Sequence, residues 1–286
     1  MKLIIISGLS GSGKTTALHT LEDEEYYCVD NLPIGLLPQF VDSLLQQRVQ
    51  LYDSVAVGID ARSNADDLRE FNTIIKTLNQ RDIEIEIIYI QAELNTLIKR
   101  FSDTRRKHPL TRKGLPLSES IEVERSLLKE VATAADLYVD TTYTNIHELR
   151  SYIKERVVKR PQTHLSLLFQ SFGFKNGAPS DSDFVFDVRC LPNPHWETNL
   201  RALTGQDPDV IAFLQEQDDV QQMLEHIKSY LNFVIPKFIK QNRHYLTISI
   251  GCTGGQHRSV YISEALHEDF RNDLEHVSIR HRELGL

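Results

Sequence analysis

Eight residues near the start of the chain constrain its fold and its chemistry more than any others. Gly8-Leu9-Ser10-Gly11-Ser12-Gly13-Lys14-Thr15 matches the phosphate-binding pattern G-x-x-x-x-G-K-[ST] at every required position. The apolar run Lys2 to Ser7 predicts a buried strand before it, and Thr16 to Glu22 predicts a helix after it. In that setting backbone N–H groups surround phosphate oxygens, Lys14 reaches the β- and γ-phosphates, and the Thr15 hydroxyl holds Mg²⁺. The sequence therefore predicts a nucleoside triphosphate site.

Length and composition indicate a globular protein of two domains. The chain has 286 residues, of which 41% are hydrophobic and 25% are charged. We find no apolar run long enough to span a bilayer, no signal peptide, and only three cysteines, so we expect a cytoplasmic protein without membrane contact. The net charge of −8 argues against a protein that coats nucleic acid with its whole surface, but it leaves room for a local basic patch.

From residue 1 to about 157 the pattern alternates between strand and helix. Further strands are predicted over residues 26–29, 54–59, 83–90 and 137–139, and helices over 36–46, 65–78, 94–101, 118–134 and 145–157. This alternation predicts an α/β fold, with a parallel sheet covered by helices on both faces. Lys159-Arg160-Pro161 breaks the pattern. We therefore place a P-loop nucleotide-binding domain at 1–157, a linker at 158–163 and a second domain at 164–286.

The second half has a different pattern. Strands are predicted over residues 164–169, 184–188 and 245–250, and helices over about 220–239 and from the end of the 251–259 loop to about 270. Two prolines in Leu191-Pro192-Asn193-Pro194-His195-Trp196 exclude regular structure there. His195 and Trp196 are candidates for a small polar ligand pocket, although a packed loop tryptophan accounts for Trp196 equally well.

Two aspartates and a basic segment are the other candidates in the first half. Asp30 and Asp60 follow predicted strands at the edge of the sheet where ligands bind, so either can position Mg²⁺ or a nucleophile, although aspartate is also a common turn and helix-cap residue. The segment Lys99–Lys113 carries seven Lys/Arg against one Asp. It is either an arginine-bearing lid over the phosphates, a nucleic-acid patch, or a solvated basic face.

A second candidate phosphate loop lies near the end of the chain. Cys252 to Ser259, Cys-Thr-Gly-Gly-Gln-His-Arg-Ser, follows a predicted buried strand and opens a helix, which is an anion-binding arrangement with an arginine to grip phosphate. The Cys-x₅-Arg-Ser spacing also matches the loop of cysteine-dependent phosphatases, with Asp187 or Asp181 as the acid. A Gly-Gly turn without a ligand is the third interpretation. Simple phosphate binding requires the fewest further groups.

Taken together, several segments resemble one family over nearly the whole chain, the RapZ/YvcJ family of bacterial nucleotide-binding proteins, known as RNase adapter proteins. The segments that carry the resemblance are Ser7–Thr15, Tyr27–Pro33, Ser102–Arg106, Ser171–Lys175, Phe186–Trp196 and Ile250–Tyr261. Together they are more specific than a P-loop alone. The resemblance implies an N-terminal P-loop kinase-like domain with ATPase and GTPase activity, and a C-terminal α/β domain that is similar to a phosphofructokinase subdomain.

The resemblance also implies ligands and site residues. It assigns ATP to Gly8–Thr15 and GTP to Asp60-Ala61-Arg62-Ser63, with Mg²⁺ as cofactor. The C-terminal domain of enterobacterial members binds glucosamine-6-phosphate and small regulatory RNA, which it presents to an endoribonuclease. Position by position, the sugar-phosphate pocket comprises Asp187, His195, Cys252, Thr253, Gly254, His257 and Arg258. On this basis we expect a regulatory protein that senses a sugar phosphate, and we expect it to form a homo-oligomer.

One departure from the family concerns RNA. RNA-binding members end in a lysine- and arginine-rich tail, whereas residues 279–286 read Ile-Arg-His-Arg-Glu-Leu-Gly-Leu. Fewer phosphate contacts weaken RNA binding, so RNA would have to engage the basic segment around Arg105–Lys113 or Lys175. The alternative functions are a small-molecule kinase whose acceptor binds near Asp30 and, less favoured, a cysteine-dependent phosphatase.

Overall fold

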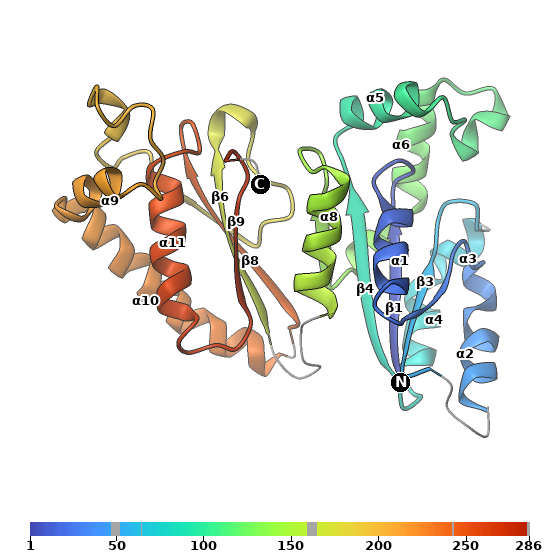
Figure 1. Ribbon diagram of the computed structural model, residues 1–286. Coiled ribbons are helices and arrows are strands. Elements are labelled where there is room, and N and C mark those ends of the chain that lie inside the picture. Colours follow the sequence, from blue (N-terminus) through green and yellow to red (C-terminus); the bar gives the residue numbers. More distant parts are fainter. Residues whose placement is uncertain (47–51, 64, 159–164, 242, 285–286) are drawn as a thin grey trace. The chain divides into compact units, whose positions relative to one another are not determined.

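The computed structural model describes residues 1–46, 52–63, 65–158, 165–241 and 243–284. The chain divides into two units, Met1–Val158 and Lys159–Leu286, and each is described here by itself (Figure 1). Nearly all of the predicted linker, 158–163, lies outside the described residues. Among the described helices, none combines the length and the apolar content needed to cross a lipid bilayer.

The first unit contains the predicted parallel sheet. Its strands are β1 (Lys2–Gly8), β2 (Tyr27–Val29), β3 (Ser54–Gly58), β4 (Glu84–Gln91) and β5 (Leu137–Asp140). They lie in the order β2-β3-β1-β4-β5, and every pairing is parallel. β1 is therefore central, and its carboxyl end opens at the position where the chain switches from one side of the sheet to the other. Ligands of open α/β sheets bind at such a point.

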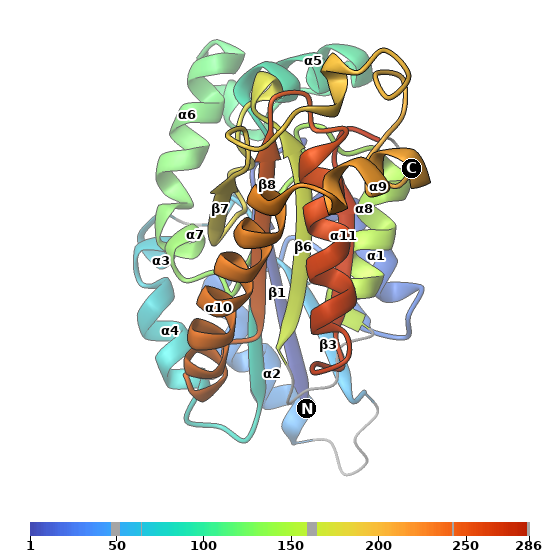
Figure 2. The same cartoon turned by 90° about the vertical axis from the view of Figure 1, so that its left-hand side faces the viewer.

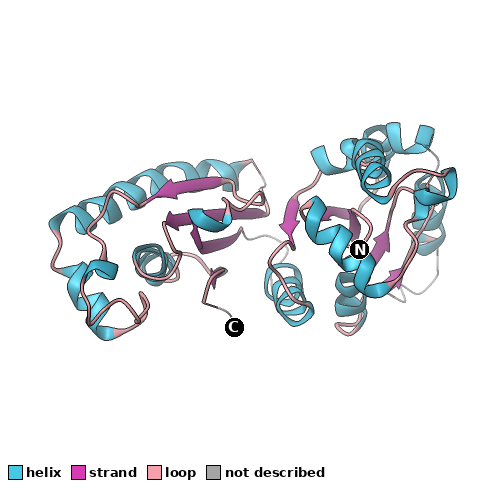
Figure 3. Cartoon of the chain, turned by 90° about the horizontal axis from the view of Figure 1, so that it is seen from above, coloured by secondary structure: helices cyan, strands magenta, loops and turns pink. Residues whose placement is uncertain are grey.

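Helices cover both faces of this sheet (Figure 3). They are α1 (Lys14–Glu22), α2 (Leu37–Leu45), α3 (Ala65–Arg69), α4 (Phe71–Leu78), α5 (Leu94–Thr104), α6 (Leu117–Leu127), α7 (Lys129–Thr133) and α8 (Ile146–Ile153), with a 3-10 turn over Pro109–Lys113. Strand alternation sends Leu3 and Ile5 toward Phe71 and Leu78 of α4, while Ile4 and Ile6 face the other side. α1 packs against α8, and α7 packs against α4. The predicted α/β architecture is confirmed.

Two predicted helices are each divided in the structure. The helix expected over 65–78 breaks at Glu70, and the one expected over 118–134 breaks at Leu128. Both residues lie in the bridge region, with φ and ψ of −86° and 6° and of −90° and 7°. At the second break the Leu128 side chain is fully buried beside Val131 in the core. Tertiary packing there outweighs the helical pattern, which sequence periodicity cannot register.

The second unit contains a second parallel sheet. β6 (Ser166–Gly173), β7 (Phe184–Asp187), β8 (Tyr245–Cys252) and β9 (Val277–His281) lie in the order β7-β8-β6-β9, all parallel. The helices α9 (Pro208–Gln215), α10 (Asp218–Lys240) and α11 (Arg258–Phe270) lie over one face of it (Figure 2). Their apolar side chains and those of β6 and β8 form one core. The described residues thus confirm an α/β fold in this half as well.

The structure adds elements that sequence reasoning missed. The sequence patterns predict neither α9 nor β9. Val277 and Ile279 of β9 pack against the core as an edge strand. Arg282, just beyond β9, is buried and donates hydrogen bonds to Gly173 O at 3.3 Å and to Gly177 O at 2.6 Å. The residues that we had compared with a basic RNA-binding tail are therefore partly built into the sheet.

Candidate functional site

The P-loop connects β1 to α1 in the conformation that a phosphate cradle requires. Gly8, Gly11 and Gly13 have positive φ angles of 142°, 85° and 114°, and α1 begins at Lys14. A Cβ atom at Gly8 would lie 1.8 Å from the Ile90 carbonyl oxygen of β4. Only glycine fits there, because the loop leaves the sheet in contact with the neighbouring strand. The sequence pattern and the local geometry agree at every one of these positions.

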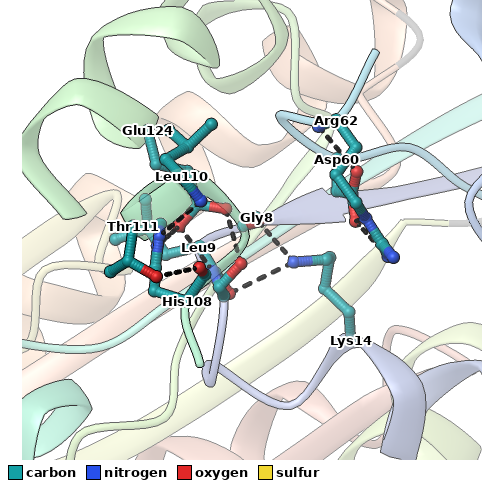
Figure 4. Close-up of polar contacts among 10 residues, drawn as sticks. Gly8, Leu9, Lys14, Asp60, Arg62, His108, Leu110, Thr111 and Glu124 are labelled. Atoms are coloured by element: carbon teal, nitrogen blue, oxygen red, sulfur yellow. Dashed lines mark hydrogen bonds and ion pairs between the residues drawn. The ribbon is translucent and has the colours of Figure 1, made fainter. Parts of the chain in front are cut away.

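Lys14 lies folded back over its own loop. Its Nζ donates hydrogen bonds to Gly8 O at 2.6 Å and to Leu9 O at 3.2 Å (Figure 4). Burial lowers the pKa of the Lys14 ammonium, and the carboxylates of Glu124, Asp60 and Asp30 act in the opposite direction. The hydrogen-bond partners of Lys14 Nζ are thus two neutral carbonyl groups. A phosphate oxygen is a stronger acceptor for it, so the arrangement favours exchange of the carbonyls for a phosphate.

Asp60 reaches the same edge of the sheet from the end of β3, as predicted. Its carboxylate is 5% exposed and accepts hydrogen bonds from Arg62: the backbone N–H at 2.9 Å, Nε at 2.8 Å and Nη2 at 2.6 Å. Arg62 Nη2 also bonds to the Asn31 side chain. The segment Asp60–Ser63 is thus a compact turn in which Arg62 covers the aspartate (Figure 4).

Two functional candidates escaped sequence reasoning, Glu124 of α6 and His108 of the turn before it. Both side chains are fully buried, and His108 Nε2 lies 3.0 Å from Glu124 Oε2. Glu124 also accepts the backbone N–H of Ser10 at 2.8 Å and its hydroxyl at 2.7 Å. The sequence does hold a signal for Glu124, because it lies three residues after Ile121 and therefore on the same, buried face of the helix. A carboxylate at such a position needs hydrogen-bond partners.

The basic segment Lys99–Lys113 is not one uniform solvated face. Arg100 of α5 is half-buried and donates to Thr141 O at 2.6 Å and to Gly11 O at 3.2 Å, so it braces the P-loop. Burial lowers the pKa of the Arg100 guanidinium. Arg105, Arg106 and Lys107 are exposed. The segment therefore joins a half-buried arginine that contacts the P-loop to a short exposed run of three cations.

The second candidate phosphate loop also follows a strand and opens a helix. β8 ends at Cys252 and α11 begins at Arg258, as predicted. The buried Cys252 Sγ accepts the backbone N–H of Gly255 at 3.2 Å and lies 3.1 Å from Ser259 Oγ. The thiol is thus enclosed by its own loop.

Arg258 differs from the phosphate-gripping residue that we expected. Its Nη1 donates to Arg189 O at 2.8 Å and to Leu191 O at 2.9 Å, which fastens the proline-rich loop to α11. Its Nη2 has one long contact, 3.5 Å to Thr253 Oγ1, and its buried Nε has no hydrogen-bond partner among the described residues. Half of the guanidinium is committed to structure, and Nη2 and Nε remain for a ligand.

The remaining predicted pocket residues lie around this loop. His257 Nε2 lies 3.3 Å from Leu200 O, burial lowers the His257 pKa, and its ring centroid is 6.3 Å from that of His195. Asp187 is paired with Arg189 at 2.7 Å, and this contact lowers the Asp187 pKa. The Arg189 guanidinium lies 4.1 Å from the Phe174 ring centroid and was not anticipated. Trp196 is 79% exposed, so it is not a packed loop residue.

Two family models match this chain, one for each of its two units. The model of the RapZ-like N-terminal domain matches residues 1–160, and that of the RapZ C-terminal domain matches residues 165–285. This chain belongs to the RapZ family. It is 55% identical over 286 residues to a nucleotide-binding protein of Thioalkalivibrio sulfidiphilus, covering 100% of both chains. It is 55% identical over 285 residues to a nucleotide-binding protein of Hahella chejuensis, again covering 100% of both.

Solved structures that match this chain have low sequence identity and low structural similarity to it. A deoxyadenosine kinase from M. mycoides is 15% identical with a TM-score of 0.33, and the match covers 56% of this chain and 100% of that one. A sugar kinase from Janibacter sp. is 12% identical with a TM-score of 0.34, covering 55% of this chain and 92% of that one.

Proposed function

We propose that this RapZ-family chain is a nucleotide-binding regulatory protein whose first unit binds and hydrolyses nucleoside triphosphates. The observation that carries the proposal is the Lys14 ammonium, held at the P-loop by two neutral carbonyl groups, 2.6 and 3.2 Å away. Charge-assisted hydrogen bonds to phosphate are about twice as strong as neutral ones. The names of the curated relatives point the same way.

The chain's residues divide the work at this site. Lys14 neutralises charge on the β- and γ-phosphates, and the loop N–H groups hold the phosphate oxygens. Thr15 is exposed at the start of α1, and its hydroxyl and the Asp60 carboxylate supply the oxygen ligands that suit Mg²⁺. Mg²⁺ bound there supplies charge neutralisation and orientation of the phosphates. Because Arg62 bonds Asp60, that arginine must turn away before the carboxylate can serve a metal or a water molecule.

Calorimetry of the full chain with MgATP and with MgGTP tests this proposal. We assign ATP to Gly8–Thr15 and GTP to Asp60–Ser63. Lys14→Ala should then weaken MgATP binding, and Arg62→Ala should weaken GTP binding more than ATP binding. Absence of triphosphate binding by the wild-type chain would refute the proposal, and equal losses for both nucleotides in Arg62→Ala would refute the separate GTP assignment.

In the second unit we propose a sensor site for a phosphorylated amino sugar, glucosamine-6-phosphate, at the Cys252–Ser259 loop. Arg258 Nη2 and Nε and the Thr253/Gly254 backbone would hold the phosphate, with Asp187 and His195 reading the amino and hydroxyl groups. The half-free guanidinium and the helix N-terminus at residue 258 support this assignment. Titration with glucosamine-6-phosphate, with glucose-6-phosphate and free glucosamine as controls, tests it.

We also propose an RNase-adapter role, in which a homo-oligomer of the chain presents small regulatory RNA to an endoribonuclease. Arg282 is hydrogen-bonded within the second unit, so the cations assigned to RNA are the exposed Arg105, Arg106 and Lys107, together with exposed Lys175. Binding of a structured RNA should weaken linearly in a plot of log affinity against log salt. Neutralising Arg105–Lys107 should reduce that slope, and an unchanged slope would remove this segment from the RNA site.

A small-molecule kinase is the second candidate, because one observation favours it. The Asp30 carboxylate opposes the burial that lowers the Lys14 pKa, so it lies within electrostatic range of Lys14, and an acceptor hydroxyl held by Asp30 would lie beside the phosphates. Transfer of labelled γ-phosphate to a metabolite rather than to water would establish the kinase. The phosphatase alternative is less favoured because the Cys252 thiol is buried; full phosphatase activity in Cys252→Ser would exclude it.

A further inference from the structure

The Leu9–Ser10 peptide group of the P-loop is held from both sides. Its carbonyl oxygen, Leu9 O, accepts a hydrogen bond from Lys14 Nζ at 3.2 Å. Its N–H, on Ser10, donates to Glu124 Oε2 at 2.8 Å. In a trans peptide the carbonyl and the N–H point in opposite directions, so the cation and the carboxylate grip opposite edges of one rigid plane (Figure 4).

The carboxylate side of this grip is charged and fully enclosed. Glu124 accepts two hydrogen bonds from Ser10 and one from His108, and none of its surface is exposed. Burial alone would raise the Glu124 pKa, but the hydrogen bonds from His108 and Ser10 and the nearby Lys14 ammonium outweigh it and lower the pKa. Glu124 is therefore an anion in the folded protein, and its hydrogen bond to the peptide is charge-assisted.

His108 has a defined tautomer in this network. The Leu110 N–H donates to His108 Nδ1 at 3.2 Å, so Nδ1 is the acceptor and the ring proton is on Nε2. Nε2–H then donates to Glu124. The same His108 follows directly on the exposed cations Arg105, Arg106 and Lys107. The buried His108 side chain thus connects the Glu124 carboxylate to the exposed Arg105–Lys107 run of the basic segment.

We propose that Glu124 is a positioning residue that fixes the Leu9–Ser10 peptide and, through His108, couples nucleotide occupancy of the P-loop to the Arg105–Lys107 segment. When Lys14 turns to a phosphate, the peptide loses its hydrogen bond on the carbonyl side. Glu124 then holds the Leu9–Ser10 peptide plane without Lys14, in the orientation in which the loop can accept a phosphate. Because Glu124 contacts the loop and not the phosphates, its effect on nucleotide is indirect. This inference rests on the proposed nucleotide site.

The test uses the full chain and two measurements. The first is the dissociation constant for MgATP by calorimetry. The second is the rate of tryptic cleavage after Arg105, Arg106 and Lys107, with and without saturating MgATP. We expect MgATP to slow this cleavage in the wild type. Glu124→Gln should weaken MgATP binding about tenfold or more, the effect of losing a hydrogen bond to a charged group, and should abolish the MgATP-dependent protection.

Matched variants separate coupling from general stability. Glu122→Gln alters an exposed glutamate on the same helix and should behave as wild type in both measurements. His108→Gln keeps a donor for Glu124 but places no acceptor atom at the position of Nδ1, where the Leu110 N–H donates, so it should retain MgATP affinity within about threefold and lose the protection. A merely structural role would change cleavage equally with and without MgATP.

The outcomes distinguish the two proposals. If the wild-type chain does not bind MgATP, the proposed function fails and this inference falls with it. If it binds MgATP but gains no protection, or if Glu124→Gln keeps wild-type affinity and protection, the inference alone is overturned. Should Glu124→Gln fail to fold, unchanged nucleotide-dependent protection in His108→Gln overturns it equally.

Discussion

The two glycine-rich loops of this chain, Gly8–Thr15 and Cys252–Ser259, connect a parallel strand to a helix in the same way but hold their cations differently. Among the described residues, Lys14 Nζ donates to carbonyls of its own loop, whereas Arg258 donates to two carbonyls of a distant loop. A flexible ammonium with exchangeable partners suits a site that alternates between empty and occupied states. A guanidinium fixed from behind suits a preformed site. The difference shows that two glycine-rich loops between a strand and a helix can hold their cation either by exchangeable contacts or by fixed ones.

The largest expected effect comes from removing the exchangeable cation. Lys14→Ala should lower triphosphate hydrolysis about 10²- to 10³-fold, the usual loss when one group that stabilises transition-state charge is removed. Glucosamine-6-phosphate binding should remain unchanged, because the two loops lie in separate units. Steady-state phosphate release and calorimetry measure the two effects, with the exposed Lys76→Ala as control. An equal loss of triphosphate hydrolysis and of glucosamine-6-phosphate binding would contradict the assignment of two separate sites.

Removing Arg258, the fixed cation, should lower both the affinity for the ligand and the stability of the fold. Arg258→Ala should weaken glucosamine-6-phosphate binding by about 1.5–3 kcal/mol. It should also lower the thermal midpoint, because the Arg189 and Leu191 carbonyls lose their donor. Arg271→Ala removes an exposed arginine just after the same helix and should do neither. Unchanged sugar-phosphate affinity in Arg258→Ala would refute the pocket assignment.

The rigidity of the second loop can be examined at two adjacent glycines. Gly255 has a φ of 76°, and a Cβ there would lie 2.5 Å from Glu283 Oε2 and 2.6 Å from Gly173 N. Gly255→Ala should therefore cost about 1–2 kcal/mol of unfolding free energy from backbone strain alone. A Cβ at Gly254 meets nothing within 4 Å, so Gly254→Ala should change stability by less than about 0.5 kcal/mol. Chemical denaturation measures both, and equal costs would argue against a rigid loop.

The smallest expected effect is an acid dependence of stability that arises at Glu124, beside the first loop. The Glu124 pKa is lowered from its usual 4.5 in the folded protein. Its contribution to stability is therefore complete above about pH 4.5 and is lost as the pH falls through the lower folded pKa. Denaturation of wild type and Glu124→Gln from pH 7 to pH 3 should show a steeper acid loss for wild type. Parallel curves would mean that the carboxylate is not charged in the folded state.

The sequence predicted the features that are determined by residues close to one another along the chain. The P-loop, the alternation of strands with helices and the position of Asp60 follow from glycine spacing and apolar runs, and the structure contains all three. Glu124 and His108 escaped prediction because their importance arises only when α6 meets the P-loop, 114 residues apart in the case of Ser10 and Glu124. β9 escaped because a short edge strand has too few residues for its alternation to stand out. The roles of Arg258 and Arg189 depend on carbonyls and a ring that only tertiary contacts bring near.

The strand orders of the two sheets have a consequence for biosynthesis. All five strands of the first sheet lie within the first 140 residues, so that sheet can close while the ribosome is still translating the rest. In the second sheet β6 lies between β8 and β9, and β9 extends to residue 281. β6 therefore emerges before either neighbour: its edge toward β8 stays open for about 70 further residues, and its edge toward β9 for about 100. Nascent-chain chaperones would have most to protect at β6.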